Sequence, residues 1–454
     1  MANKEYNVKE FFKTDLPAYA AYDNARKIAS YIDGQKISMR KILYTLLKKY
    51  PGKEKIKTET LANVCAAFTN YLHGAANLCG VCNTLAQNFV GANNYAMLNG
   101  NTGGFGTRYD SNCAAPRYTK VALSDIMRKL LNENDEEIIG RQFFEGDYIE
   151  PKFFVPIFPI LFLNGSSGLS TGFSQDIYPR NPNEIIEYIK KKISGIEKPR
   201  MQLLPWFRGH LGKVEFNKEL NRNECFGVIT KNNMTSYTIT ELPIGIECKK
   251  YIEYLDKLCD NGTICDYDDK CDTETDKILF EIKTTRDFTR KHEGRKLFEV
   301  MHLVKSLPET LCCIDENNRV REFTSIQEIL DAYIEIRLKY YNLRKDYLLK
   351  SLEDNLQKLS SKYLFIKAII DKTLVVSNKK KDEIVKQLEK MPKICKINDS
   401  YDYLLAMPIH SLTKEKLEEL KKQIEDAKAE YKQIKETSIQ TMWINDLHEL
   451  KKVL

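Results

Sequence analysis

The sequence predicts an α+β protein of several domains: a winged-helix region, a mixed α/β region and a long antiparallel coiled-coil arm. Three observations predict this fold class. Two helices joined by a basic turn are indicated within residues 39–72, strand-like runs follow in residues 200–300, and apolar residues recur at helical spacing beyond Thr324. Because 454 residues exceed one ordinary hydrophobic core, about three domains are expected.

Composition excludes two broad classes of protein. With 43% hydrophobic and 29% charged residues, the chain is typical of a globular protein rather than a disordered one. Its longest apolar stretch, residues 153–163, contains Pro156 and Pro159 and is shorter than the roughly 20 residues that cross a bilayer. The amino-terminal residues lack the apolar core of a secretory signal. We therefore expect an intracellular protein with no membrane partner.

Positive charge is concentrated near one end of the chain. The net charge is +7, but residues 24–57 contain ten Lys or Arg against Asp33 and Glu54, which leaves +8 in this window alone. Such a local excess is typical of polyanion binding. A solvated helix face is the alternative explanation of a basic run.

The same window predicts the first two helices. Apolar residues at helical spacing mark both of them: Met39, Ile42, Leu43, Leu46 and Leu47, then Leu61, Val64, Phe68, Tyr71 and Leu72. The basic loop 51–57 joins them, and Thr58 precedes the second. Such a pair can place its second helix in a DNA major groove while the loop lysines hold phosphates.

The middle of the chain predicts loops and strands. Residues 74–118 are rich in Gly, Asn, Ala and Tyr, which indicates loops close to a ligand. We expect a short strand interrupted by proline at residues 153–163 and a Gly/Ser turn after it. Strands are also expected where apolar and polar residues alternate, at residues 213–216, 226–231, 236–242 and 277–283.

Two long helices are predicted beyond Thr324. Residues 326–370 keep three- and four-residue steps, which gives a helix of about 45 residues or roughly 70 Å. A heptad seam runs from Leu417 to Ile434. We expect the two helices to pair antiparallel, with residues 374–410 forming a small helical domain at the far tip. An inert coiled-coil spacer would explain this stretch equally well.

The cysteines and histidines do not predict a metal site. Twelve cysteines are scattered, and only Cys79 and Cys82 have C-x-x-C spacing without a second pair nearby. The six histidines never fall within five residues of one another. We expect reduced, buried thiols and no metal ligands.

The string AAPRYTK, residues 114–120, is the most informative short motif. A tyrosine is usually a packing residue, and a phenol with a pKa near 10 is only about 0.1% ionised at pH 7. Using it as a nucleophile at neutral pH costs about 4 kcal/mol, which the site must offset. Arg117 beside Tyr118 can supply part of this stabilisation and can hold a phosphate oxygen in its planar fork.

This string and several others resemble the type IIA DNA topoisomerases over nearly the whole chain. The other strings are D-G-x-K-x-x-x-R-K at 33–41, Y-x-H-G at 71–74, L-A-Q-N-F-V-G at 85–91, G-F-G-T-R at 104–108 and N-G-x-x-G-L-x-T-G at 164–172. Residues 240–243, 337–344 and 412–418 match further family segments. The eukaryotic-type enzymes are more similar than bacterial gyrase, and a viral member is our nearest match.

The resemblance implies roles for individual residues. Tyr118 would attack the DNA backbone and form a 5′-phosphotyrosyl link, with Arg117 as its phosphate clamp. Leu169, where many relatives have isoleucine, would insert between base pairs and help to bend the duplex. The other DNA contacts that we expect, from these motifs and the basic loop, are Arg40, Lys41, Lys36, His73, Lys55, Lys57, Gln87, Asn88 and Arg108.

The resemblance also implies a domain organisation. Residues 1–162 would form the winged-helix DNA-binding domain with the tyrosine, and residues 163–308 the mixed α/β tower domain. Residues 309–454 would form the coiled-coil arm and a helical dimerisation domain, the C-gate. Because cutting both strands needs two tyrosines, a symmetric homodimer is expected.

The Mg²⁺ and ATP that the full-length enzymes use are expected in other domains, named Toprim and ATPase, which we do not find in this sequence. Glu145-Gly146-Asp147 and the pair Asp266 and Asp268 resemble parts of the carboxylate motif but stand in the wrong context. We therefore expect a fragment that binds duplex DNA but does not cleave or relax it alone. Its location would be the host cytoplasm if viral and otherwise the nucleus.

The alternative function is a non-catalytic architectural protein that binds duplex DNA and carries coiled-coil arms. In that case Tyr118 would be a structural residue. A scaffold without any nucleic-acid role fits the local +8 window poorly.

Overall fold

The structure is a computed structural model that describes residues 8–101, 104–273, 275–376, 379–391, 393–397, 399–408 and 412–454. Parts of two predicted segments, the Gly-rich loop at 102–103 and the predicted tip domain within 374–410, lie outside the described residues. The chain forms two compact units, one of Met1–Arg337 with Asp446–Leu454 and one of Leu338–Asn445. This division does not separate residues 1–162 from 163–308, so those boundaries stay a prediction.

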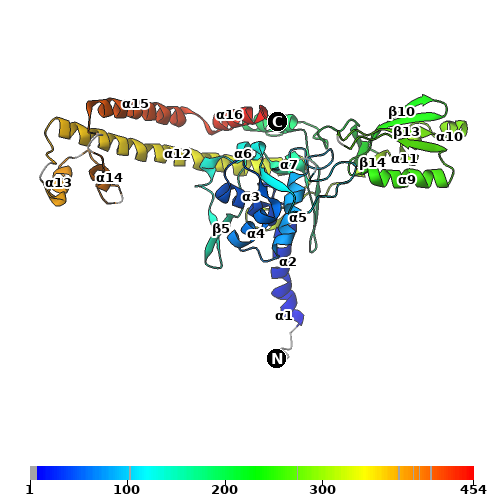
Figure 1. Cartoon of the computed structure of the whole chain (residues 1–454), viewed down its shortest axis with the longest axis horizontal. Coiled ribbons are helices and arrows are strands. Elements are labelled where there is room, and N and C mark those ends of the chain that lie inside the picture. Colours follow the sequence, from blue (N-terminus) through cyan, green and yellow to red (C-terminus); the bar gives the residue numbers. More distant parts are fainter. Residues whose placement is uncertain are drawn as a thin grey trace. The chain divides into compact units, whose positions relative to one another are not determined.

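The first unit begins with helices around a small sheet (Figure 1). The helices are α1 (Val8–Lys13), α2 (Asp15–Lys27), α3 (Ile37–Lys49), α4 (Thr58–Phe68) and α5 (Ala75–Ala86). Strands β1 (Ile56–Lys57), β3 (Lys120–Leu123) and β2 (Leu98–Gly100) form an antiparallel sheet in the order β1-β3-β2. The predicted pair of helices with a basic turn is therefore confirmed as α3, residues 51–57 and α4.

The next segment carries two hairpins and two short helices. Its elements are α6 (Asp125–Leu130), the 3₁₀ turn η1 (Glu133–Asp135), β4 (Arg141–Phe144), β5 (Asp147–Pro151), α7 (Ile160–Asn164), β6 (Ser166–Leu169) and β7 (Ser174–Ile177). Strands β4 and β5 pair with each other, as do β6 and β7.

The predicted strand at residues 153–163 is wrong. Residues 153–159 form no strand, and α7 begins at Ile160. Pro156 and Pro159 lack the N–H that a strand ladder needs. The apolar character of the run reflects burial instead, because Phe158, Leu161 and Phe162 are fully enclosed.

The four strands predicted between residues 213 and 283 are confirmed within a mixed α/β region. Two sheets form there, in the orders β10-β11-β13-β12 and β14-β9-β8. The elements are α8 (Pro182–Ile193), β8 (Val214–Asn217), β9 (Arg222–Phe226), β10 (Val228–Asn233), β11 (Ser236–Glu241), α9 (Cys248–Asp260), β12 (Asp266–Asp269), β13 (Phe280–Lys283), α10 (Arg286–Lys291), α11 (Arg295–Val300), β14 (Val304–Leu307), β15 (Cys312–Ile314) and β16 (Val320–Glu322). The face of β11 and β13 that carries Tyr237, Ile239 and Ile282 packs with α9 in one core.

The second unit confirms the long helices. Helix α12 (Ile326–Ile370) has the predicted 45 residues and continues into this unit, where α15 (Lys414–Glu436) lies beside it (Figure 1). The pairing is antiparallel, since Tyr431 donates a 2.6 Å hydrogen bond to Glu353 while Lys345 reaches the Thr437 carbonyl at 2.7 Å. Short helices α13 (Lys381–Leu388) and α14 (Asp402–Leu405) share a core with both.

The last helix, α16 (Ile439–Lys451), returns the chain to the first unit. Within that unit, the Leu454 carbonyl accepts a 2.8 Å hydrogen bond from Tyr95, and His448 lies 2.8 Å from the Lys190 ammonium. Among the described residues, no helix has an apolar stretch long enough to cross a membrane.

Candidate nucleic-acid interface

Tyr118 stands at the end of a tight turn directly before β3. Its amide donates to the Ala115 carbonyl at 2.9 Å. The next residue, Thr119, is fully buried, and its hydroxyl donates to that of Thr58 at 2.7 Å at the start of α4. The backbone around the tyrosine is therefore fixed from below, while the Tyr118 side chain is 68% exposed.

Arg117 places a positive charge beside this phenol. Its guanidinium carbon lies 4.8 Å from the centre of the Tyr118 ring, and the side chain is exposed. An exposed cation over an aromatic face is held loosely, by roughly 0.5–1 kcal/mol. The guanidinium therefore keeps its hydrogen-bond donors available for an anion next to the hydroxyl.

The loop that leads to Tyr118 is tied down at several points. The Ala114 amide donates to the Gly104 carbonyl at 3.0 Å, and the Gln87 side-chain amide donates to the Ser111 carbonyl at 3.1 Å. Gln87, predicted to contact DNA, thus braces the loop from within, whereas Asn88 is exposed beside it.

Arg108 does not reach the surface where a phosphate would bind. It is 5% exposed, and its guanidinium lies 2.5 Å from the Glu241 carboxylate and donates to the Leu242 carbonyl at 2.7 Å. Burial opposes ionisation of Glu241, but His210 and Arg108 together hold the pKa of this carboxyl below its usual value. The predicted DNA contact is corrected here to an internal ion pair.

Arg40 and Lys41 are corrected in the same way. The Arg40 guanidinium grips the Asp33 carboxylate with bonds of 2.7 and 3.1 Å. The Lys41 ammonium lies 2.9 Å from Glu150 and donates to the Thr69 carbonyl at 2.6 Å. Both side chains are buried, because a charge is stable in an interior when its partner neutralises it. Their place in the family motif therefore serves the packing of α3.

His73, Lys55 and Lys57 do lie at the surface. The Nε2 atom of His73 is 2.6 Å from the Tyr22 hydroxyl, and Nδ1 is 3.5 Å from the Arg26 guanidinium. Burial and the Arg26 charge lower the pKa of His73, so the ring is neutral at pH 7. The Lys55 ammonium donates to the Gly100 carbonyl at 2.6 Å, which joins the basic turn to β2.

Leu169 projects from the hairpin of β6 and β7 and is 79% exposed. Asp23 fixes the turn behind it by accepting bonds from the Thr171 amide at 3.1 Å and from the hydroxyls of Thr171 and Ser170 at 2.8 and 3.0 Å. Lys27 and these donors lower the pKa of Asp23. An apolar tip on a rigid hairpin can act as a wedge.

Comparison with known proteins decides the family. The family model that describes the gyrase-A-type polypeptide of DNA gyrase/topoisomerase IV matches residues 26–448. The chain belongs to this family. The topoisomerase family therefore provides the frame for the site residues described above.

Individual relatives agree with this assignment. The chain is 31% identical to the DNA topoisomerase 2, mitochondrial, of Dictyostelium discoideum, over 99% of this chain and 35% of the relative. It is 29% identical to the DNA topoisomerase 2 of Invertebrate iridescent virus 6, over 98% of this chain and 39% of that protein. The chain thus spans about a third of the length of these curated relatives.

A solved structure shows the same architecture. The crystal structure of the Plasmodium falciparum topoisomerase II DNA-binding, cleavage and re-ligation domain matches with a TM-score of 0.88 and 31% identity. The match covers 98% of this chain and 64% of the other.

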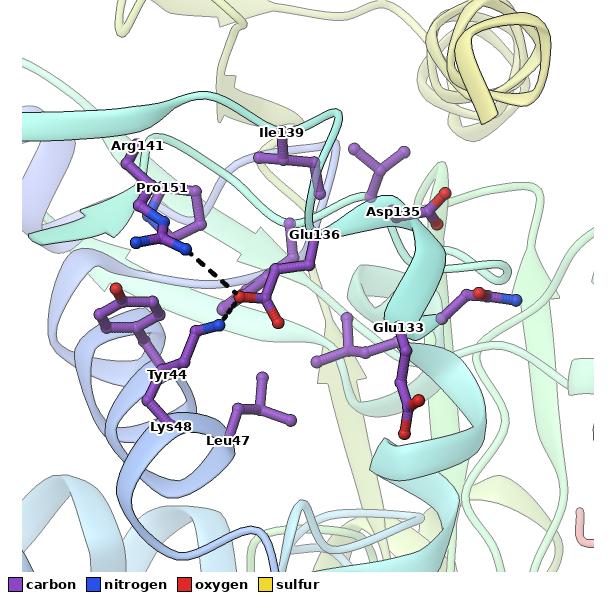
Figure 2. Close-up of a pocket in the computed structure, with 13 residues that line it drawn as sticks. Tyr44, Leu47, Lys48, Glu133, Asp135, Glu136, Ile139, Arg141 and Pro151 are labelled. Atoms are coloured by element: carbon purple, nitrogen blue, oxygen red, sulfur yellow. Dashed lines mark ion pairs between the residues drawn. The ribbon is translucent and has the colours of Figure 1, made fainter. Parts of the chain in front are cut away.

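A separate pocket lies beside α3 in this topoisomerase chain (Figure 2). Apolar residues such as Leu47 and Ile139 line it, and Glu136 points between Lys48 and Arg141 and forms ion pairs with both. None of the predicted site residues lines this pocket. It is therefore distinct from the surface that carries Tyr118.

Sequence reasoning missed Asp23 as a site residue. It lies outside every family string quoted above, and 147 positions separate it from Ser170. A local pattern cannot reveal a contact of that sequence separation. The helical period of α2, which ends next to the Leu169 hairpin, carries no signal of it either.

Proposed function

We propose that this chain is the DNA-binding and cleavage portion of a type IIA DNA topoisomerase. The observation that carries the proposal is the exposed Tyr118 hydroxyl on a rigid turn, with the Arg117 guanidinium beside its ring. The tyrosine oxygen attacks a backbone phosphorus and loses its proton, and the bond from phosphorus to the 3′ oxygen breaks as the new bond forms. Because a phosphodiester replaces a phosphodiester, the reverse attack by the 3′ hydroxyl reseals the strand.

Charge stabilisation explains the residue beside the nucleophile. The non-bridging phosphate oxygens become more crowded with charge as the tyrosine oxygen approaches. A bidentate guanidinium is the side chain best matched to this geometry. Arg117 is therefore proposed as the phosphate clamp.

The finer fold assignments belong to this proposal. The helices α3 and α4 with the sheet β1-β3-β2 are interpreted as a winged-helix domain, and the β8 to β14 region as the tower. The pair α12 and α15 is interpreted as the coiled-coil arm and the helical tip as a C-gate dimer contact. A homodimer would supply one tyrosine to each DNA strand.

The described residues do not fit a site for the catalytic Mg²⁺. They contain no group of three or more His, Cys, Asp or Glu side chains that could hold a metal. Asp266 and Asp268 face the Lys283 ammonium at 2.9 and 3.6 Å instead. We propose that Mg²⁺ and ATP bind to separate Toprim and ATPase domains, inside the cell, in the host cytoplasm if the protein is viral and otherwise in the nucleus.

The deciding experiment uses Tyr118→Phe in this chain joined to a metal-binding cleavage domain. Covalent complexes with end-labelled duplex DNA are trapped by denaturation and counted, and DNA affinity is measured by fluorescence anisotropy. We expect adducts to disappear while affinity stays nearly unchanged, because the phenyl ring remains. Phe143→Ala is the control, since it removes an equally exposed aromatic ring from another hairpin.

The alternative is an architectural duplex-binding protein. It predicts no adduct with either tyrosine or phenylalanine at position 118. An equal adduct yield in both forms would reject Tyr118 as the nucleophile. For the chain alone, we expect no relaxation of supercoiled plasmid with Mg²⁺, and efficient relaxation would contradict the assignment of the metal to another domain.

A further inference from the structure

A groove of about 410 Å³ lies next to the Leu169 hairpin. Residues 164–167, which lead into β6, form one wall, and the loop residues 91–93 form another. Two lysines line it, Lys36 from the segment before α3 and Lys305 from β14. Residues more than 250 positions apart in the sequence thus share one hollow.

The two ammonium groups are held by backbone carbonyls alone. Lys36 donates to the Ser167 carbonyl at 2.6 Å, and Lys305 donates to the Ile244 carbonyl at 3.0 Å. Neither has a carboxylate within ion-pair distance in the part of the chain that the structure describes. Burial lowers the pKa of Lys36, as expected for a cation that lacks a counter-charge.

One carboxylate, Asp176, also lines the groove, so the charged side chains leave an excess of positive charge. Like charges in one hollow repel each other, and an anion that reaches both ammonium groups removes that cost. The free donors on each lysine suit the oxygens of a phosphate.

The backbone around Lys305 is shaped to seat its ammonium. Gly245 has a φ of +79°, and a Cβ added there would lie only 2.7 Å from the Lys305 nitrogen. Any side chain at residue 245 would displace the ammonium from the groove. Glycine therefore serves both the turn and the placement of the charge.

We propose that Lys305, together with Lys36, binds a backbone phosphate of duplex DNA that is bent at Leu169. The inference rests on the proposed function and adds a DNA contact from β14 that no family string in the sequence indicates. Ser166 and Ser167 line the groove, and the exposed Leu169 follows them in the same strand. A duplex opened by the Leu169 side chain would carry its backbone over these two lysines.

The test compares Lys305→Gln with the unaltered chain in duplex binding. Glutamine keeps a donor for the Ile244 carbonyl and removes only the charge, and the melting temperature is measured to check the fold. We expect affinity for a 30-base-pair duplex to fall about 3–10-fold at 100 mM salt. We also expect the slope of log K against log salt to lose about 0.9, the value for one phosphate contact.

Three further variants make the result specific. Lys305→Arg should restore both affinity and slope, and Lys36→Gln should reproduce the loss. Lys283→Gln is the matched control, because it removes an exposed ammonium that is paired with Asp266 outside the groove. Bending is followed by energy transfer between dyes on the two DNA ends, and we expect less bending with Lys305→Gln.

The outcomes separate the two proposals. If Lys305→Gln binds and bends DNA like the unaltered chain, the groove contact is rejected and the proposed function stands. If inorganic phosphate raises the melting temperature through Lys305 while DNA binding does not need this residue, the groove is a free-anion site and the inference is also rejected. If the unaltered chain does not bind duplex DNA at all, both proposals fail.

Discussion

Glu241 is a buried carboxylate shared by two cationic side chains from different segments. One oxygen lies 2.5 Å from Arg108, and the other lies 3.5 Å from Nδ1 of His210 and accepts the Leu211 amide at 3.0 Å. Arg108 belongs to the loop that leads to Tyr118. The carboxylate thus joins this loop to the end of β11 and to residues 210–211.

Removing the charge of Glu241 should destabilise the protein strongly. Glu241→Gln would leave Arg108 buried without a counter-charge, which costs about 3–5 kcal/mol. The free energy of unfolding in urea measures the loss. Asp266→Asn breaks the exposed pair with Lys283 and should have little effect. Equal effects of the two substitutions would show that burial does not set the strength of the Glu241 cluster.

The stability of the cluster should depend on pH through His210. Burial opposes its protonation, but Cys225, whose sulfur lies 3.3 Å from Nε2, and Glu241 outweigh this and raise the pKa of His210 to about 9. Because the folded pKa exceeds the usual 6.5, protonation stabilises the fold. That contribution is complete below about pH 6.5 and is lost as the pH rises through 9.

The comparison with His210→Gln tests this dependence. Glutamine cannot gain a proton, so the difference in unfolding free energy between the two proteins should shrink steadily from pH 6.5 to 9.5. Urea titrations at a series of pH values measure it. A difference that stays constant across this range would mean that His210 does not titrate in the cluster.

At the level of residues, the sequence predicted identity better than environment. The exposure of Tyr118 and Leu169 agrees with their predicted roles. Arg40, Lys41 and Arg108 were expected at the surface, yet their partners Asp33, Glu150 and Glu241 enclose them. A basic residue in a motif does not reveal whether a carboxylate meets it in space, since 133 positions separate Arg108 from Glu241.

The hairpin of β6 and β7 separates function from stability at the level of elements. Asp23 supports its turn through three hydrogen bonds, whereas the Leu169 side chain contacts mostly solvent. An exposed apolar tip contributes little to folding. The supported turn and the free tip can therefore be altered one at a time.

Leu169→Ala should reduce DNA bending without loss of stability. We expect the melting temperature to change by less than about 2 °C, since a surface substitution usually costs within 0.5 kcal/mol. Energy transfer between dyes on the DNA ends should report a smaller bend. Asp23→Asn is the contrasting variant, because it weakens the turn that carries the tip. Unchanged bending in Leu169→Ala would remove the wedge from the proposal.

Elements with a long, regular period were predictable, and a featureless apolar run was not. Helix α12 was expected over the observed residues because its three- and four-residue steps continue for many turns. Residues 153–163 have no such period, so a strand and a buried irregular segment look alike in sequence. The acidic strand β12 was also missed, because four residues that include Asp266 and Asp268 carry no apolar alternation.

At the level of the whole molecule, each compact unit contains one of the two tryptophans. Trp206 lies in the first unit, and Trp443, fully buried against Tyr341 with ring centres 5.6 Å apart, lies in the second. The second unit also has its own core around Ile366 and Leu388. Tryptophan fluorescence can therefore report on each unit separately.

The two units should unfold at different denaturant concentrations. Trp206→Phe leaves only Trp443 as a reporter, and Trp443→Phe leaves only Trp206. Because separate cores open with separate free energies, we expect two distinct urea midpoints. Circular dichroism of both variants controls for changes in overall stability. Coincident midpoints would mean that the chain unfolds as one cooperative body.

The return of the chain through α16 makes the second unit an insertion between Arg337 and Asp446 rather than an appended tail. Two peptide crossings therefore tether it. A protease that nicks one crossing leaves the halves covalently linked through the other, and only a double cut releases the arm. Any tension that acts on the arm during a catalytic cycle would likewise be shared by two strands of polypeptide.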